Sequence, residues 1–62
     1  MQSEFPQVTY KGRRWEYRGR TPGGMIRLWA IGGGASLTVP RECVTIPSSQ
    51  IAAVVRFDDA AR

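Results

Sequence analysis

The chain has 62 residues, a net charge of +4 and a pI near 10.2, which is enough for one small domain with a thin hydrophobic core. Its single cysteine and its lack of histidine exclude an internal disulfide, a four-ligand structural zinc site, and Ser-His-Asp or Cys-His catalysis within one chain. We therefore expect no metal and no cofactor, and a fold stabilised by regular small-domain packing or by self-association.

No segment has the sequence features of a targeting signal or a membrane span. Residues 1–6 lack a basic region followed by an apolar one. The longest apolar run, residues 51–55, is far shorter than the roughly 20 residues of a membrane helix. A lone cysteine is typical of a reducing compartment. We expect no membrane partner and a cytoplasmic location, in a bacterium or one of its phages or plasmids.

Alternation of apolar and polar residues predicts strands from residue 8 onward, after a flexible arm at residues 1–7. The second predicted strand, residues 13–18, places Trp15 and Tyr17 on one face. The opposite face of that strand carries Arg14, Glu16 and Arg18. The sequence Thr-Pro-Gly-Gly at residues 21–24 then predicts a type II turn, with glycine supplying the positive φ at the second central position.

The next strand, residues 25–30, is expected to turn its apolar side chains inward and the others outward. The inward set is Ile26, Leu28 and Ala30, and the outward set is Met25, Arg27 and Trp29. A flexible glycine loop at residues 32–34 leads to a strand with Leu37 and Val39 inward. Residues 40–43 fit a one-turn 3₁₀ helix, because proline is favoured at a first helical position. Another short strand is expected at residues 44–46.

Residues 51–57 allow two interpretations. An alternating pattern places Ile51, Ala53, Val55 and Phe57 on one face, which favours a final strand. The domain would then span residues 8–57. A short helix after Ser48 or Ser49 is the alternative, because the apolar residues also fit helical spacing. The β-branched content favours the strand. Residues 58–62 are expected to be a polar tail.

The predicted fold is all-β, a small barrel of about five short strands with a one-turn 3₁₀ helix near residues 40–43. Its expected core is Val8, Trp15, Tyr17, Ile26, Leu28, Leu37, Val39, Val44 and Ile46. Residues 8–46 resemble a Src-homology-3 (SH3-like) barrel of the prokaryotic or KOW type. The resemblance rests on Tyr10-x-Gly12 with Trp15-x-Tyr17-x-Gly19, and on Val39-Pro40 leading through a 3₁₀ turn to Cys43-Val44. It implies architecture and no particular activity.

The positive charge is concentrated in residues 11–27, where six basic residues oppose Glu16 alone, so six minus one leaves +5. Outward arginines beside an outward tryptophan are a combination that binds nucleic acid, with guanidinium groups on phosphates and an aromatic ring under a base. The candidate binding residues are Lys11, Arg13, Arg14, Arg18, Arg20, Met25, Arg27 and Trp29. The same residues also fit a solvated surface.

The sequence therefore favours a small non-enzymatic binding module, in which this basic and aromatic face binds DNA or RNA in a regulatory protein. Two other functions remain open: a protein-interaction module such as an adaptor or antirepressor, and a structural homo-oligomer. We find no catalytic constellation, because Asp58 and Asp59 lack apolar surroundings and Glu16 lies between arginines.

Overall fold

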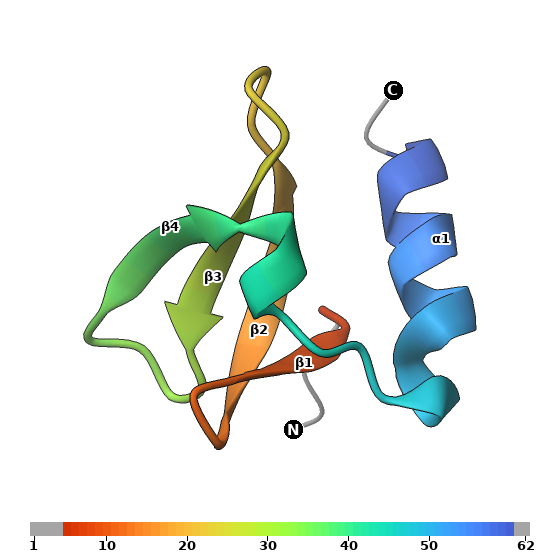
Figure 1. Cartoon of the computed structure of the whole chain (residues 1–62). Helices are drawn as coiled ribbons and strands as arrows, with labels where there is room; N and C mark the ends of the chain where they lie inside the picture. Colours follow the sequence, from red (N-terminus) through yellow and green to blue (C-terminus); the bar gives the residue numbers. More distant parts are fainter. Residues whose placement is uncertain (1–4, 61–62) are drawn as a thin grey trace.

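The protein is described from a computed structural model, which places residues 5–60. Within them one antiparallel sheet has the order β1-β2-β3-β4. Its strands are β1 (Gln7–Tyr10), β2 (Arg13–Arg20), β3 (Met25–Ala30) and β4 (Ser36–Pro40). Two 3₁₀ turns, η1 (Arg41–Cys43) and η2 (Ser48–Gln50), lead to the helix α1 (Ile51–Ala60), which stands along one side of the sheet (Figure 1).

The core lies between the curved sheet and the C-terminal segment. Its buried residues are Val8, Trp15, Tyr17, Ile26, Leu28, Val39, Val44 and Val54. The sequence predicts all of these except Val54, because alternation within β1, β2 and β3 sorts side chains by face. Ile46 packs against the core from a partly buried position. Leu37 is the wrong assignment, since it is 37% exposed.

A β-bulge in β2 changes the direction of the side chains at its end. Tyr17 pairs with Leu28, but the next pair is Arg20 with Ile26, so β2 advances by one residue more than β3. The residue inside the bulge, Gly19, has a φ of +102°, a backbone conformation that glycine adopts readily. Arg20 consequently lies on the same face as Tyr17, whereas strict alternation would place it beside Arg18.

The β2–β3 turn also differs from the expectation. The amide of Gly24 donates to the carbonyl of Thr21 at 3.0 Å, but the positive φ, +84°, falls on Gly24 and not on Gly23. The turn is therefore not type II, which needs the positive φ at its second central residue. The Thr21 hydroxyl accepts a hydrogen bond from the amide of Met25 at 3.1 Å and closes the loop.

The described residues form neither a closed barrel nor a fifth strand, in contrast to the predicted barrel of about five strands. The 3₁₀ turn is confirmed at Arg41–Cys43. After it, the predicted strand at residues 44–46 is reduced to one bridge, in which Thr45 and Thr9 exchange two hydrogen bonds of 2.8 and 2.9 Å. This bridge covers part of the free edge of β1, and no segment within residues 5–60 forms a comparable bridge to β4.

Residues 51–57 belong to α1, so the strand interpretation is wrong and the helical alternative holds. The helix buries Val54 and packs the ring of Phe57 edge-on against Tyr17, with the ring centroids 5.5 Å apart. A Cβ atom added at Gly19 would lie 3.5 Å from the Phe57 ring. This is an ordinary van der Waals distance, so the bulge needs glycine for its positive φ and not for room beside the helix.

The two ends of the described chain are both in contact with the sheet. Residues 5–7 of the predicted arm lie against β2, where the carbonyl of Pro6 accepts a hydrogen bond from the amide of Tyr17 at 2.7 Å. Asp58 and Asp59 of the predicted tail belong to α1. Residues 1–4 and 61–62 lie outside the described residues. No helix among residues 5–60 is long and apolar enough to cross a membrane.

Candidate functional site

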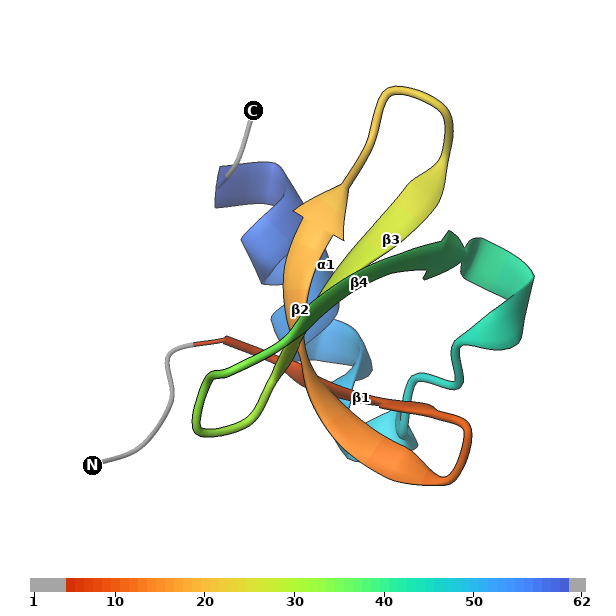
Figure 2. The ribbon, with the colours of Figure 1, turned by 90° about the vertical axis from the view of Figure 1, so that its left-hand side faces the viewer.

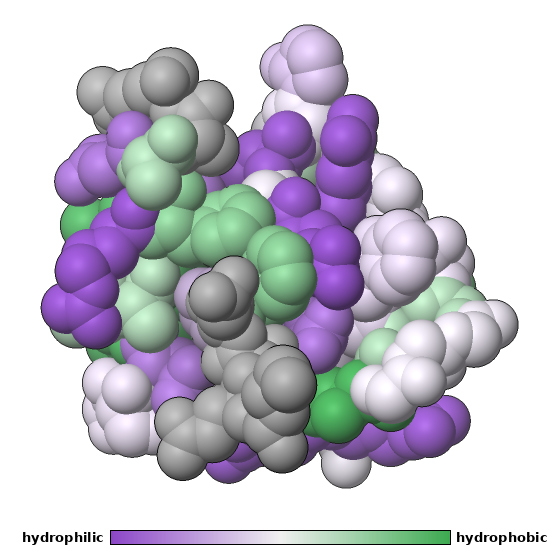
Figure 3. All heavy atoms as spheres, turned by 180° about the vertical axis from the view of Figure 1, so that it is seen from behind, coloured by the Kyte–Doolittle hydropathy of each residue, from purple (hydrophilic) through white to green (hydrophobic). Residues whose placement is uncertain are grey.

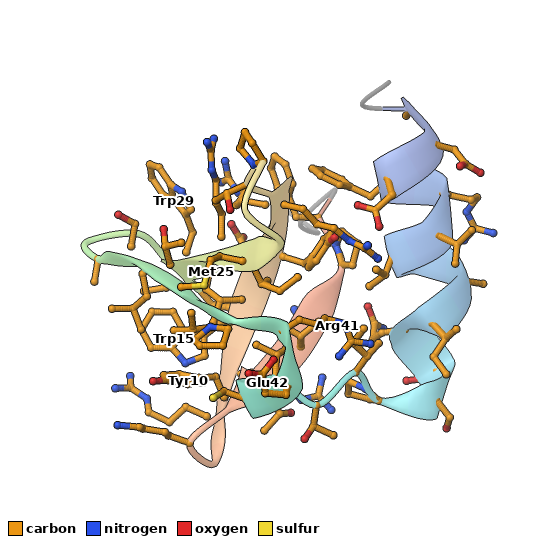
Figure 4. All side chains as sticks on the ribbon, turned by 45° about the horizontal axis from the view of Figure 1, so that its top comes forward. Tyr10, Trp15, Met25, Trp29, Arg41 and Glu42 are labelled. Atoms are coloured by element: carbon orange, nitrogen blue, oxygen red, sulfur yellow. The ribbon has the colours of Figure 1, made fainter. Side chains whose placement is uncertain are left out.

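The sheet has an outer face, on the side away from the core, that carries most of the predicted binding residues. Register places Glu16 opposite Trp29, and Trp29 opposite Ser36. The outer face consists of Arg14, Glu16, Arg18, Met25, Arg27, Trp29, Ser36 and Thr38. Figure 4 shows the two tryptophans on opposite sides of the sheet, Trp15 toward the core and Trp29 away from it. The predicted inside and outside assignment of β2 and β3 is therefore confirmed up to the bulge.

Trp29 is fixed in place by Arg18 and still exposes 43% of its surface. The Arg18 guanidinium lies 4.7 Å from the centroid of the Trp29 ring and 3.6 Å from that of Phe5. Its Nη2 donates to Oε1 of Glu16 at 2.9 Å. Contacts of a guanidinium with aromatic rings are favourable because the ring quadrupole attracts the cation. The tryptophan is thus a pre-positioned, partly exposed aromatic surface.

The other two arginines of the outer face are more accessible. Arg27, opposite Thr38, is exposed and has no ion pair among residues 5–60. Arg14 is exposed, and its Nη1 donates to Oε1 of Gln7 at 3.3 Å. The three arginines of the outer face contribute +3 and Glu16 contributes −1, so the face has a net charge of +2. Seen from behind, the molecule has strongly hydrophilic side chains directly beside hydrophobic ones (Figure 3).

Three predicted binding residues lie away from the outer face. Lys11 is in the β1–β2 turn, with its Nζ 5.6 Å from the centroid of the Tyr10 ring. Arg13 lies over the core-side Trp15, at 5.8 Å from the ring centroid. Arg20 is rotated away by the bulge, and its Nη2 is 3.3 Å from Oδ2 of Asp58 on α1. The structure therefore brings Arg14, Arg18, Arg27, Trp29 and Met25 together and separates the rest.

Sequence reasoning missed Phe5, which supports the outer face from the N-terminal side. Its ring lies 5.7 Å from the ring of Phe57, which in turn contacts Tyr17. A continuous row of aromatic and guanidinium contacts therefore runs from the helix through Phe5 and Arg18 to Trp29. No local signal in the sequence marks Phe5 for this position, because its contacts are with residues far away in the chain.

A separate polar cluster fastens α1 to β2. The Tyr17 hydroxyl donates to Oδ1 of Asp58 at 2.7 Å and accepts from Nε of Arg20 at 3.4 Å. Burial and the hydrogen bond to Asp58 raise the pKa of the Tyr17 phenol above its ordinary value of 10.0. The hydrogen bond to Tyr17 and the charge of Asp58 raise the pKa of Arg20. The cluster is structural, since it lies between the helix and the sheet.

The raised pKa of Tyr17 predicts how stability changes in alkali. Folding favours the protonated phenol, so this contribution is present below pH 10.0, the ordinary value, and is lost as the pH rises through the folded-state pKa. We expect Tyr17→Phe to lose about 1–2 kcal/mol below pH 10, and the wild-type advantage to shrink above it. Urea unfolding of both proteins from pH 8 to 11.5 measures this, and parallel curves above pH 10 would contradict it.

Comparison with known proteins gives no family assignment: no protein-family model, curated protein or solved structure matches the chain. Among residues 5–60, no group of three or more histidine, cysteine, aspartate or glutamate side chains is placed to hold a metal ion. Cys43 is exposed at the end of η1. The outer face of the sheet is therefore the candidate functional site.

Proposed function

We propose that the protein is a small non-enzymatic binding module that holds single-stranded nucleic acid on the outer face of its sheet. The observation that carries the proposal is the exposed ring of Trp29, held by Arg18 next to the exposed Arg27. Proteins that bind single strands combine an aromatic surface for a base with cations for the backbone. This face offers both on adjacent strands.

Trp29 supplies the base contact. Its ring is already positioned by the Arg18 guanidinium, which is itself held by Glu16 and Phe5, so little side-chain entropy is lost when a base stacks on it. A base inside a duplex has both of its faces covered by its neighbours. The proposal therefore specifies a single strand, in which a base is free to stack on an aromatic side chain.

Arg27 and Arg14 supply the phosphate contacts. Both are exposed, and neither is neutralised by a carboxylate among the described residues. Two phosphate contacts on a single strand give a slope of log K against log salt of about −1.4. Between 50 and 200 mM salt this corresponds to about a sevenfold loss of affinity. The weak slope distinguishes a two-arginine site from binding by the whole basic segment.

The test is fluorescence anisotropy with a labelled twelve-nucleotide single strand and the matching duplex, at both salt concentrations. We expect tighter binding of the single strand. Trp29→Ala should weaken binding by roughly 5- to 150-fold, the loss of one base stack. Arg27→Glu should also weaken binding and reduce its salt dependence, because one of the two phosphate contacts is lost. Circular dichroism and thermal unfolding establish that each variant is folded.

Arg56→Glu is the matched control for Arg27→Glu. Arg56 is exposed on α1, away from the outer face, and the two substitutions change the net charge equally. Equal losses in the two variants would mean diffuse attraction by a basic protein and would contradict a localised site. No binding of either nucleic acid at 50 mM salt would also reject the proposal, and would favour the protein-interaction module as the alternative function.

We also propose that the fold is an open relative of the SH3-like barrels. The four-stranded meander, the 3₁₀ turn after Val39-Pro40 and the return of Thr45 to Thr9 support this. In such a small barrel the meander and the turn carry the resemblance, and the helix takes the place of a final strand.

A further inference from the structure

We propose that two copies of this protein associate through β4, so that their sheets join into one continuous antiparallel sheet. The proposal does not depend on the proposed function. It rests on the difference between the two edges of the sheet, on the exposure of Leu37, and on the position of Pro40.

The described part of the chain, residues 5–60, covers one edge of the sheet and leaves the other open. On β1, Thr9 is paired with Thr45, and the amide of Gln7 donates to Oε1 of Gln50 at 3.0 Å. Among the residues described, β4 pairs only with β3. Figure 2 shows β4 in the foreground, with no other segment across it. Residues 36–38 are all exposed.

The open edge lacks the features that prevent strands from pairing. Natural edge strands are protected by charged side chains, bulges or proline within the strand. Residues 36–39 read Ser-Leu-Thr-Val, carry no charge, and run in continuous register against β3 without a bulge. Proline comes only at the last position of the strand, Pro40.

The hydrogen bonds of the sheet identify which backbone groups are available. The amide of Ala30 donates to the carbonyl of Ala35 at 2.9 Å. Because antiparallel pairs alternate between bonded and non-bonded, residues 35, 37 and 39 direct their backbone groups toward β3. Ser36 and Thr38 therefore direct their N–H and C=O groups toward the open edge.

Pro40 selects the register of the joined strands. It has no N–H, and the chain turns into η1 immediately after it. A two-fold axis at Leu37 places Ser36 of each copy opposite Thr38 of the other, which pairs every available donor and acceptor. An axis at Thr38 would place Ser36 opposite Pro40 and leave the Ser36 carbonyl without a donor.

The same register accounts for the exposure of Leu37. By alternation this residue lies on the core side of β4, and yet it is exposed. A two-fold axis at Leu37 makes the two leucines a non-hydrogen-bonded pair, with Cα atoms about 4.5 Å apart and side chains in contact. Leu37 lies opposite the fully buried Leu28. Pairing therefore extends the apolar core across the axis. The second copy is the occupant that this self-complementary, uncharged strand fits.

Sedimentation of the wild-type protein tests the association directly. We expect the mass to rise from 6.9 kDa toward twice that value as concentration increases. Thr38→Pro removes the N–H that faces the open edge and keeps the β3 ladder intact. It should weaken the dimer roughly 25-fold, since two hydrogen bonds are lost, each worth about a factor of five. Thr38→Val keeps the N–H and should associate like the wild type.

Cysteine pairing tests the register. In a Cys43→Ser background, Leu37→Cys places two thiols at the axis, within the distance that a disulfide spans. Ser36→Cys and Thr38→Cys place each thiol opposite a hydroxyl of the other copy. Mild oxidation should link the Leu37→Cys protein at least tenfold faster than the other two. Equal rates, or a wild-type protein that stays monomeric at millimolar concentration, would overturn the proposal.

Discussion

Replacing Leu28 with aspartate is expected to leave the chain unfolded at room temperature. Leu28 is 0% exposed and lies at the centre of the sheet, between Tyr17 on β2 and Leu37 on β4. An unpaired carboxylate at this depth costs several kcal/mol, whereas the core of a chain this small supplies about 3–5 kcal/mol in total. Far-ultraviolet circular dichroism should show the loss of the sheet.

Leu37→Asp is the matched control for this substitution. Leu37 is the direct partner of Leu28 in the neighbouring strand, but it is 37% exposed, so its carboxylate can remain hydrated. We expect this variant to fold, and to sediment as a monomer. Loss of folding in both variants would mean that Leu37 belongs to the core, and a folded Leu28→Asp protein would contradict the face assignment of β3.

Val54→Asp is expected to have the second largest effect. Val54 is 4% exposed on the side of α1 that faces the sheet, and its neighbour Val55 is 53% exposed. Burial of a charge between helix and sheet should cost about 3 kcal/mol or more and detach the helix. Val55→Asp should change the free energy of unfolding by less than about 0.5 kcal/mol. Urea unfolding followed by circular dichroism measures both.

This pair of variants also distinguishes the two interpretations of the C-terminal segment. A strand would place Val55 on the inner face with Ile51 and Phe57, and would turn Val54 outward. The helix reverses these positions, because Val54, Phe57 and Asp58 share one side at helical spacing. A larger loss of stability in Val55→Asp than in Val54→Asp would support the strand and contradict the helix.

The alternation rule predicted the faces of β2 and β3 well because each of these strands has one buried side. Trp15 and Tyr17 are inside and Trp29 is outside, as the pattern requires. It failed at Leu37, because alternation gives the face of a residue but not whether that part of the face is covered. β4 is an edge strand, and its Leu37 lies where the described chain provides no further layer.

The helix and the bulge could not be predicted for different reasons. Residues 51–57 satisfy both periodicities, so only packing decides between them, and the helix places Val54, Phe57 and Asp58 against β2 at once. The bulge depends on Gly19, whose positive φ is one of several conformations that glycine adopts. The bulge turns Arg20 away from the outer face of the sheet and places it beside Asp58.

The long-range attachment of the C-terminal segment also sets the order in which the molecule assembles. The meander joins only strands adjacent in the chain, whereas the Gln7–Gln50 and Tyr17–Asp58 contacts close loops of 43 and 41 residues. Closing a longer loop costs more chain entropy before any contact compensates for it. We expect the hairpins to form early and the C-terminal segment to dock late. The docking of this segment onto the sheet should therefore limit the rate of folding.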